Sequence, residues 1–219
     1  MSISSTDALI IYKNPRKVKI NLYFSNTNQD KIFMSEGTFM KNEKYFKKYI
    51  ETVADFPKEE IMFRDITPTL ENAEAFKETI DAMAEIASKY EFNKIICADA
   101  RGFLFGSALA YKLNKGIVVA RKPGKLPRPG FKFSYSLEYG ENVLMISQNS
   151  LEKGEKVLVV DDLLATGGSA AAMVELVKMA EAIPVAAIFY IELPDLDGRD
   201  FIKKASDIPI HSLVNFEGE

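Results

Sequence analysis

The hydrophobic positions of this chain follow two periods, and their alternation predicts strands separated by helices. Short, mainly apolar runs are typical of buried strands, and they occur at 94–98, 116–121, 157–160 and 185–193. Residues 103–113 and 167–180 are longer segments rich in alanine and leucine, which favour helices. Because strands that alternate with helices form parallel sheets, the pattern predicts an α/β fold with a parallel-sheet core and helices on both faces.

Two more helices are predicted nearer the N-terminus. Residues 73–90 place apolar side chains on one side of a helix, and Asn72 is a suitable N-cap. The aromatic and aliphatic residues between Tyr45 and Val53 also recur near helical spacing, and Pro57 disfavours helix in the residue before it. We therefore expect a first helix that begins near Tyr45 and ends before Pro57.

Two segments depart from this alternation. Residues 134–140, SYSLEYG, and 142–147, NVLMIS, flank a turn at Gly140 and predict an antiparallel flap beside the parallel sheet. Residues 1–33 are polar and irregular, and they predict an N-terminal appendage. The alternatives are a mobile tail, a misjudged translation start ahead of Met34, or a short strand or arm that packs on the body. The predicted organisation is thus an appendage at 1–33 and one domain at 34–219.

Composition narrows the possible partners and the compartment. The chain has 219 residues, with 28 Lys and Arg against 31 Asp and Glu, and its net charge of -3 argues against a general nucleic-acid binder. The apolar runs are much shorter than the roughly 20 residues needed to cross a bilayer, so we expect no membrane span. The single cysteine, Cys97, cannot form an internal disulfide, which favours a cytoplasmic protein.

The strongest chemical signal is the segment 157–176, in which an apolar strand leads into two carboxylates, a loop of small residues and a helix. Ligands of parallel sheets bind beyond the carboxyl ends of the strands, where Asp161 and Asp162 stand. Adjacent carboxylates can accept hydrogen bonds from the two hydroxyls of a ribose. The following helix N-terminus suits a phosphate, and its loop comprises Ala165, Thr166, Gly167, Gly168 and Ser169.

This loop is not a nucleoside-triphosphate loop, because no lysine follows its glycines, and the chain has no GxGxxG dinucleotide fingerprint. The pattern therefore indicates a ribose 5-phosphate group. The alternative is that the carboxylates only cap the loop and the glycines only turn it.

The segment DDLLATGGS at 161–169 resembles the phosphoribosyl pyrophosphate motif of the type I phosphoribosyltransferases. In order along the chain, FRDITP, ARGFLFGSALA, RKPGKLP and SYSLEYG extend the resemblance over nearly all of 56–216, and together they resemble the adenine phosphoribosyltransferases. The resemblance implies a type I core with a small hood and a flexible flap, dependence on Mg²⁺ held mainly by substrate and water, and a homodimer.

By this resemblance, Ala100 and Arg101 belong to the loop that binds pyrophosphate, although the family more often has serine where Ala100 stands. Basic side chains of RKPGKLP, namely Arg121, Lys122 and Lys125, would add positive charge around pyrophosphate, with the alternative of a solvated basic loop.

The resemblance also assigns the flap and the base site. Glu138 and Tyr139 would close over the reaction centre, where Glu138 and Arg101 would be the catalytic residues; the alternative for Glu138 is a surface charge. Adenine would be bound by Met62, Phe63, Arg64 and Leu163. The chain departs from the family at 56–60, where FPKEE replaces a turn that commonly carries proline and glycine, so the geometry of base selection is the least defined part.

The resemblance implies that adenine and phosphoribosyl pyrophosphate are converted to AMP and pyrophosphate in purine salvage. Two other functions stay open from the sequence. The same fold could use another purine base, or it could serve as a non-catalytic sensor of phosphoribosyl pyrophosphate that regulates transcription or binds RNA.

Overall fold

The structure is a computed structural model, and it describes residues 34–35, 38–39, 42–137 and 140–218. The chain divides into two compact units, Met1–Asn42 and Glu43–Glu219. In the first unit, the short strands β1 (Met34–Ser35) and β2 (Thr38–Phe39) pair antiparallel. The predicted boundary between residues 33 and 34 stays a prediction, because residues 1–33 lie outside the described part.

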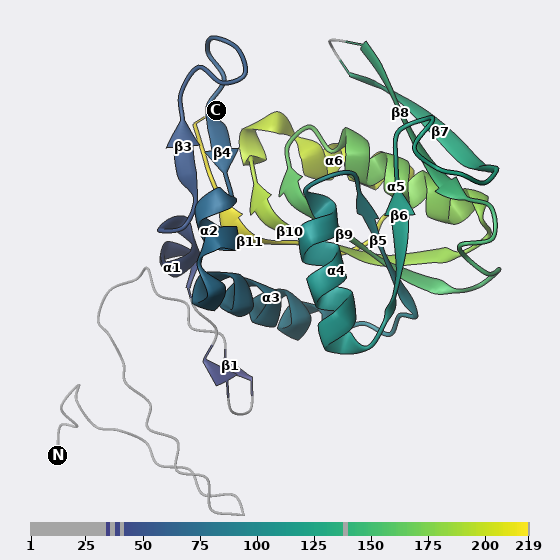
Figure 1. Cartoon of the computed structure of the whole chain (residues 1–219), viewed down its shortest axis with the longest axis horizontal. Coiled ribbons are helices and arrows are strands. Elements are labelled where there is room, and N and C mark those ends of the chain that lie inside the picture. The colour runs from purple at the N-terminus through teal and green to yellow at the C-terminus, as the bar shows by residue number, and fades with distance from the viewer. Residues whose placement is uncertain (1–33, 36–37, 40–41, 138–139, 219) are drawn as a thin grey trace, which may run out of the picture. The chain divides into compact units, whose positions relative to one another are not determined.

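A five-stranded sheet forms the centre of the second unit, with strand order β11-β10-β9-β5-β6 and all neighbours parallel (Figure 1). Its strands, in chain order, are β5 (Lys94–Ala98), β6 (Gly116–Ala120), β9 (Lys156–Leu164), β10 (Ile183–Glu192) and β11 (Ile210–Asn215). The four apolar runs of the sequence are all strands of this sheet, which confirms the predicted parallel core.

Helices cover both faces of the sheet, as predicted (Figure 1). On one face, α3 (Ala73–Ala87) and α4 (Gly102–Leu113) meet β10, where the Phe105 ring lies 5.3 Å from the Tyr190 ring. On the other face, α5 (Gly168–Met179) and α6 (Gly198–Ala205) share a buried cluster with Val159 and Phe189. Asn72 caps α3 by accepting a hydrogen bond from the Ala75 N–H at 2.9 Å, which confirms the predicted start of that helix.

Two antiparallel hairpins flank the sheet (Figure 1). The hairpin of β7 (Gly130–Leu137) and β8 (Gly140–Ser147) lies beside β6, joined to it by a bridge between Arg121 and Met145. This hairpin is the predicted flap. The second hairpin pairs β3 (Glu51–Val53) with β4 (Phe63–Asp65), near the β11 edge. Short helices α1 (Glu43–Lys47), α2 (Thr67–Glu71) and the 3-10 turn η1 (Pro194–Leu196) complete the described unit.

The predicted helix between Tyr45 and Pro57 is wrong over most of its length. Helix α1 ends at Lys47, and residues Glu51–Val53 instead pair with β4 in the second hairpin. Pairing with a distant strand satisfies the backbone of 51–53, and the β-branched side chains of Thr52 and Val53 favour that conformation. Among the described residues, no helix has the length and apolar character that a membrane crossing needs.

Candidate active site

A pocket opens at the carboxyl ends of β5 and β9, the position expected for a ligand of a parallel sheet. Its volume is about 260 Å³. Helices α4 and α5 both start at this pocket, so two helix N-termini, each with unpaired backbone N–H groups and a partial positive charge, border one space. The pocket is lined by Ala98, Asp99, Ala100, Arg101, Asp161, Asp162, Leu163, Leu164, Ala165, Thr166, Gly167, Gly168, Ser169 and Ala170.

The two carboxylates stand near the carboxyl end of β9, line the pocket and are almost fully buried, with exposed fractions of 7% for Asp161 and 5% for Asp162. The Asp162 N–H donates to Asp161 Oδ1 at 3.0 Å, and Arg101 Nε lies 2.8 Å from Asp162 Oδ2. That contact is an ion pair without hydrogen-bond alignment, and the buried Oδ2 accepts no hydrogen bond from the described residues. A ligand with hydroxyl donors would supply what this oxygen lacks.

Burial and mutual repulsion set the charge state of the pair. Burial raises the pKa of Asp161, and the neighbouring Asp162 carboxylate raises it further. Burial also raises the pKa of Asp162, and the charge of Arg101 partly offsets this effect. Because buried carboxylates with raised pKa values cluster at functional sites, the pair marks the pocket as a candidate active site.

The phosphate loop, residues 165–169, joins β9 to α5. Gly167 has a φ of +80°, a backbone conformation that residues other than glycine rarely adopt, and α5 begins at the next residue. The Ser169 hydroxyl forms a 3.0 Å hydrogen bond with the Tyr135 hydroxyl of β7. The loop therefore presents backbone donors to the pocket, and one of its side chains is tied to the flap.

The opposite wall is formed by the turn between β5 and α4. Ala100 and Arg101 both line the pocket, as their assignment to a pyrophosphate loop requires. Gly102 packs so closely on the carboxylates that a Cβ added there would stand 2.4 Å from Asp161 Oδ1. Only glycine can therefore bring the start of α4 this close to Asp161, a requirement that the sequence reasoning did not include.

The three basic residues after β6 stand apart from the pocket lining. Arg121 Nε donates to Asp99 Oδ2 at 3.0 Å, and Asp99 lines the pocket, so Arg121 reaches the site through a carboxylate. Arg121 Nη1 also donates to the Lys125 carbonyl at 3.2 Å. The side chains of Lys122 and Lys125 are exposed and do not line the pocket.

The four residues predicted to bind the purine base lie in two groups. Leu163 lines the pocket, and Phe63 begins β4, where its ring centroid is 5.2 Å from Arg101 Cζ. Phe63 also meets Phe56 edge to face, with 5.1 Å between ring centroids. A cation over one ring and a second ring at its edge make an aromatic platform next to the carboxylates.

The other two predicted base residues have different surroundings. The Arg64 guanidinium lies 4.4 Å from the centroid of the Phe216 ring, and its Nη1 donates to Thr52 Oγ1 at 2.5 Å. Met62 directly precedes β4 and is 38% exposed. Neither residue lines the pocket.

The loop at 56–60, where the chain departs from the family pattern, is held by local hydrogen bonds. Glu60 has a φ of +70°, a conformation that glycine adopts more readily, and its N–H donates to Asp55 Oδ1 at 2.9 Å. This loop carries Phe56 to the edge of Phe63. The assigned flap residues Glu138 and Tyr139 lie outside the described residues.

Sequence reasoning missed Tyr135 and Gly102. Tyr135 stands in the quoted flap segment, three residues before Glu138, and its alternation with Phe133 and Phe131 on one face of β7 could have indicated an inward position. Gly102 is the first residue of α4, directly after the turn assigned to pyrophosphate.

Comparison with known proteins agrees with this geometry. Residues 68–200 match the family model of the phosphoribosyl transferase domain. The chain is similar to the adenine phosphoribosyltransferase of Brachyspira hyodysenteriae, with 48% identity over 170 residues that cover 78% of this chain and 98% of that protein. It is 50% identical to the Thermotoga maritima adenine phosphoribosyltransferase over 168 residues, or 77% of this chain and 95% of that protein.

Solved structures show the same similarity. Adenine phosphoribosyltransferase from Thermoanaerobacter pseudethanolicus superposes with a TM-score of 0.76 at 43% identity, and covers 80% of this chain and 100% of its own. The Saccharomyces cerevisiae enzyme, solved in complex with an imino-altritol bisphosphate and adenine, gives a TM-score of 0.72 at 38% identity, with coverages of 78% and 97%. The chain therefore belongs to the phosphoribosyl transferase domain family and, within it, to the adenine phosphoribosyltransferases.

Proposed function

We propose that the protein transfers the phosphoribosyl group of phosphoribosyl pyrophosphate to adenine, giving AMP and pyrophosphate in purine salvage. The observation that carries the proposal is a pocket in which two helix N-termini meet a buried carboxylate pair. One helix N-terminus suits the 5′-phosphate, the second suits pyrophosphate, and the carboxylates between them suit the ribose hydroxyls. Family membership and the adenine bound by the yeast relative support the choice of base.

The reaction is a displacement at the anomeric carbon. A nitrogen of adenine forms a bond to that carbon while the bond to the pyrophosphate oxygen breaks, so the electron pair of the broken bond leaves with pyrophosphate. Asp161 and Asp162 would hold the ribose, and the loop 165–169 would hold its phosphate. The carboxyl oxygens of Asp161 and Asp162 would lie close to the sugar, where positive charge develops in the transition state.

The leaving group and the base are assigned to the remaining residues. The backbone around Ala100 and the guanidinium of Arg101 would bind pyrophosphate, with Arg121 contributing through Asp99. Phe63 and Leu163 would bind the two faces of adenine. Glu138 would accept the proton that adenine loses or steady charge on the ribose, and closure of the flap with Tyr139 would exclude water.

We propose Mg²⁺ as the cofactor, held mainly by substrate oxygens and water. Within the described residues, no group of three or more His, Cys, Asp or Glu side chains could hold a metal ion. The adjacent carboxylates offer at most a partial set of oxygen ligands, which fits an ion that arrives with a phosphorylated substrate. When bound, the ion would neutralise charge on the departing pyrophosphate.

We also propose that the enzyme is a cytoplasmic homodimer in which Lys122 and Lys125 act near pyrophosphate. Both lysines are exposed and stand outside the pocket lining, so a closed loop or a second subunit is needed to bring them to the ligand. Sedimentation velocity at working concentration tests the dimer, and a purely monomeric active enzyme would contradict it.

The decisive experiment measures pyrophosphate release by purified protein with phosphoribosyl pyrophosphate, Mg²⁺ and adenine, guanine, hypoxanthine or xanthine in turn. We expect turnover with adenine alone and a large loss in the Glu138→Ala variant. Turnover with another base would overturn the assignment of the base site. Absence of turnover with every base, in a folded protein that binds phosphoribosyl pyrophosphate, would refute the enzymatic function in favour of a sensor.

A further inference from the structure

The phosphate loop rests on the start of α6, backbone against backbone. A Cβ added at Gly198, the first residue of α6, would stand 2.1 Å from the Ala165 carbonyl oxygen and 3.1 Å from the Gly167 nitrogen. From the other side, a Cβ added at Gly167 would stand 2.4 Å from the Gly198 carbonyl oxygen. The Leu164 Cδ1 atom also lies 2.8 Å from the Cβ added at Gly198, but the backbones of the two segments meet directly. A shift in the position of α6 would therefore press on the backbone of the loop.

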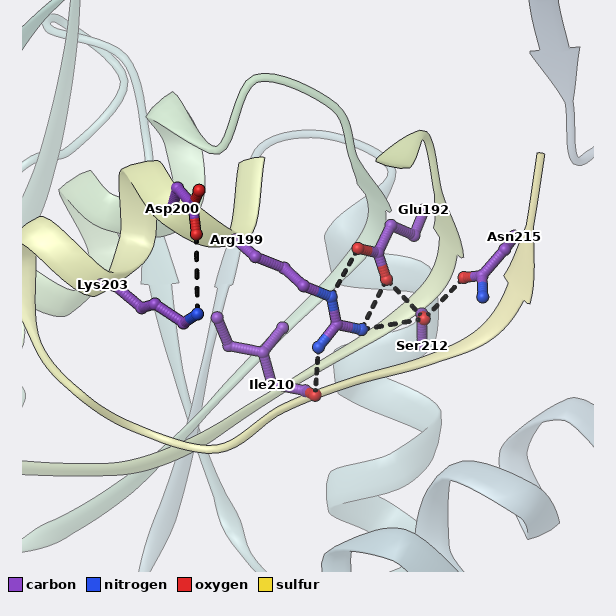
Figure 2. A network of polar contacts seen from close by, with 7 residues as sticks. All are labelled: Glu192, Arg199, Asp200, Lys203, Ile210, Ser212 and Asn215. Atoms are coloured by element: carbon purple, nitrogen blue, oxygen red, sulfur yellow. Dashed lines mark hydrogen bonds and ion pairs between the residues drawn. The ribbon is translucent and has the colours of Figure 1, made fainter. Parts of the chain in front are cut away.

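A two-pronged ion pair holds the start of α6 in place (Figure 2). Arg199, the residue after Gly198, donates from Nε to Glu192 Oε1 and from Nη2 to Glu192 Oε2, each at 2.6 Å. Its third nitrogen, Nη1, donates to the Ile210 carbonyl of β11 at 2.9 Å. All three nitrogens of the guanidinium are therefore bound, and this fixes the direction as well as the distance of the contact.

Glu192 is itself held firmly in the sheet. It ends β10 with an exposed fraction of 4%, and Ser212 Oγ donates to its Oε2 at 2.6 Å (Figure 2). In the sheet register Glu192 stands opposite Leu164, the last residue of β9 before the phosphate loop. The strand that delivers the loop and the carboxylate that anchors α6 are thus direct neighbours.

Ionisation of Glu192 is maintained although the side chain is buried. Burial alone would raise its pKa, but hydrogen bonds from Arg199 and Ser212 outweigh that effect and lower the pKa. Glu192 is buried, whereas the Arg199 side chain is 41% exposed. Because the desolvation cost of a buried charge offsets much of the attraction in such a pair, the property that matters for the loop is the fixed direction of the contact rather than its contribution to stability.

We propose that Arg199 is a positioning residue for the phosphate loop. Its ion pair with Glu192 holds Gly198 against Ala165 and Gly167, and so sets the backbone donors of the loop at the spacing that a sugar phosphate needs. The identity of the ligand as the 5′-phosphate of phosphoribosyl pyrophosphate rests on the proposed function. The clamp, by which we mean the Arg199–Glu192 ion pair together with the contact of Gly198 with the loop, rests only on the contacts between α6, β10 and the loop.

The test uses Arg199→Lys, which keeps the charge but loses the planar fork, and Gly198→Ala, which pushes directly on the loop. Lys203→Ala is the matched control, because Lys203 lies on the same helix and only pairs with Asp200, at 3.5 Å and near solvent (Figure 2). For each folded variant, steady-state kinetics give separate KM values for phosphoribosyl pyrophosphate and adenine. Calorimetric titration with ribose 5-phosphate gives a binding constant that requires no turnover.

We expect Arg199→Lys and Gly198→Ala to raise the KM for phosphoribosyl pyrophosphate and the Kd for ribose 5-phosphate about tenfold. A full displacement of about 1 Å can cost about a hundredfold, and both substitutions act on the loop only through the start of α6. The KM for adenine should stay within about twofold, and Lys203→Ala should match the wild type in all three constants. Arg199→Lys decides the question if Gly198→Ala does not fold.

Two results would overturn the positioning role. One is wild-type affinity for both sugar phosphates in folded Arg199→Lys protein. The other is an equal rise in both KM values, which would make Arg199 a purely structural residue. Failure of the proposed function is distinguishable, because it appears as absence of AMP in the wild type, while ribose 5-phosphate binding still reports on the clamp.

Discussion

Replacement of Gly102 by alanine tests whether the close approach of α4 to the carboxylate pair is needed for catalysis. The added Cβ would stand 2.4 Å from Asp161 Oδ1, whereas carbon and oxygen in contact are normally about 3.3 Å apart or more. Asp161 or the start of α4 must therefore move by about 1 Å. A misplacement of about 1 Å can cost about a hundredfold in rate, equivalent to about 2.7 kcal/mol of transition-state stabilisation.

The assay is kcat/KM for AMP formation from adenine and phosphoribosyl pyrophosphate, with thermal unfolding measured on the same samples. We expect Gly102→Ala to lose about a hundredfold in kcat/KM, with a loss of about 1–3 kcal/mol in stability from overpacking. Gly154→Ala is the matched control. Its φ of +77° strains alanine by about 1–2 kcal/mol, and no atom lies within 4 Å of the added Cβ.

The control separates instability from local displacement. Gly154→Ala should lose stability and keep kcat/KM, because Gly154 is absent from the pocket lining. Activity of Gly102→Ala within threefold of the wild type would refute the reasoning, since it would mean that the carboxylates tolerate a displaced helix start. Parallel losses of activity in both variants would refute it as well.

Three further results are expected. Tyr135→Phe removes the 3.0 Å hydrogen bond to Ser169 and should lower the free energy of unfolding in urea by about 1 kcal/mol. Burial raises the pKa of the Cys97 thiol to about 12, so iodoacetamide at pH 8 should leave it unmodified in folded protein and alkylate it after denaturation, as read by mass spectrometry. The pKa of Glu192 is lowered from 4.5, so the stability that its ionised form contributes is present above that pH and lost as pH falls through the lower folded value. The difference in melting temperature between wild type and Glu192→Gln should therefore shrink in acid, and a constant difference from pH 7 to pH 3 would contradict the assigned charge.

The phosphate loop and its carboxylates could be predicted because their signal is local. Strand, acidic pair, glycines and helix follow one another within 157–176, and each local preference agrees with the structure formed. The hairpin of β3 and β4 could not be predicted in the same way. Its stability comes from pairing Glu51–Val53 with residues 63–65, whereas the apolar spacing of residues 45–53 also fits a helix.

Contacts between segments far apart in the sequence explain why the roles of Arg199 and Gly102 could not be predicted. Arg199 lies in the polar segment DGRDFIKK, where its local sequence gives no sign of a buried partner. Its partners Glu192 and Ile210 belong to β10 and β11, which become neighbouring strands only when the sheet forms. Gly102 is required because of a contact with Asp161, a residue 59 positions later, and no spacing rule connects them.

Arg101, which lines the pocket, contacts both a carboxylate of the pair and the Phe63 ring outside the pocket lining. Its Nε is 2.8 Å from Asp162 Oδ2, while its guanidinium carbon lies 5.2 Å from the centroid of Phe63. A ligand hydroxyl that donates to Asp162 Oδ2 would share this oxygen with the guanidinium, and any shift of the guanidinium would change the contact that Arg101 makes with the Phe63 ring. Binding of a sugar at the carboxylates and binding of a base at Phe63 would therefore be thermodynamically linked. If the first ligand changes the affinity for the second by some factor, the second changes the affinity for the first by the same factor.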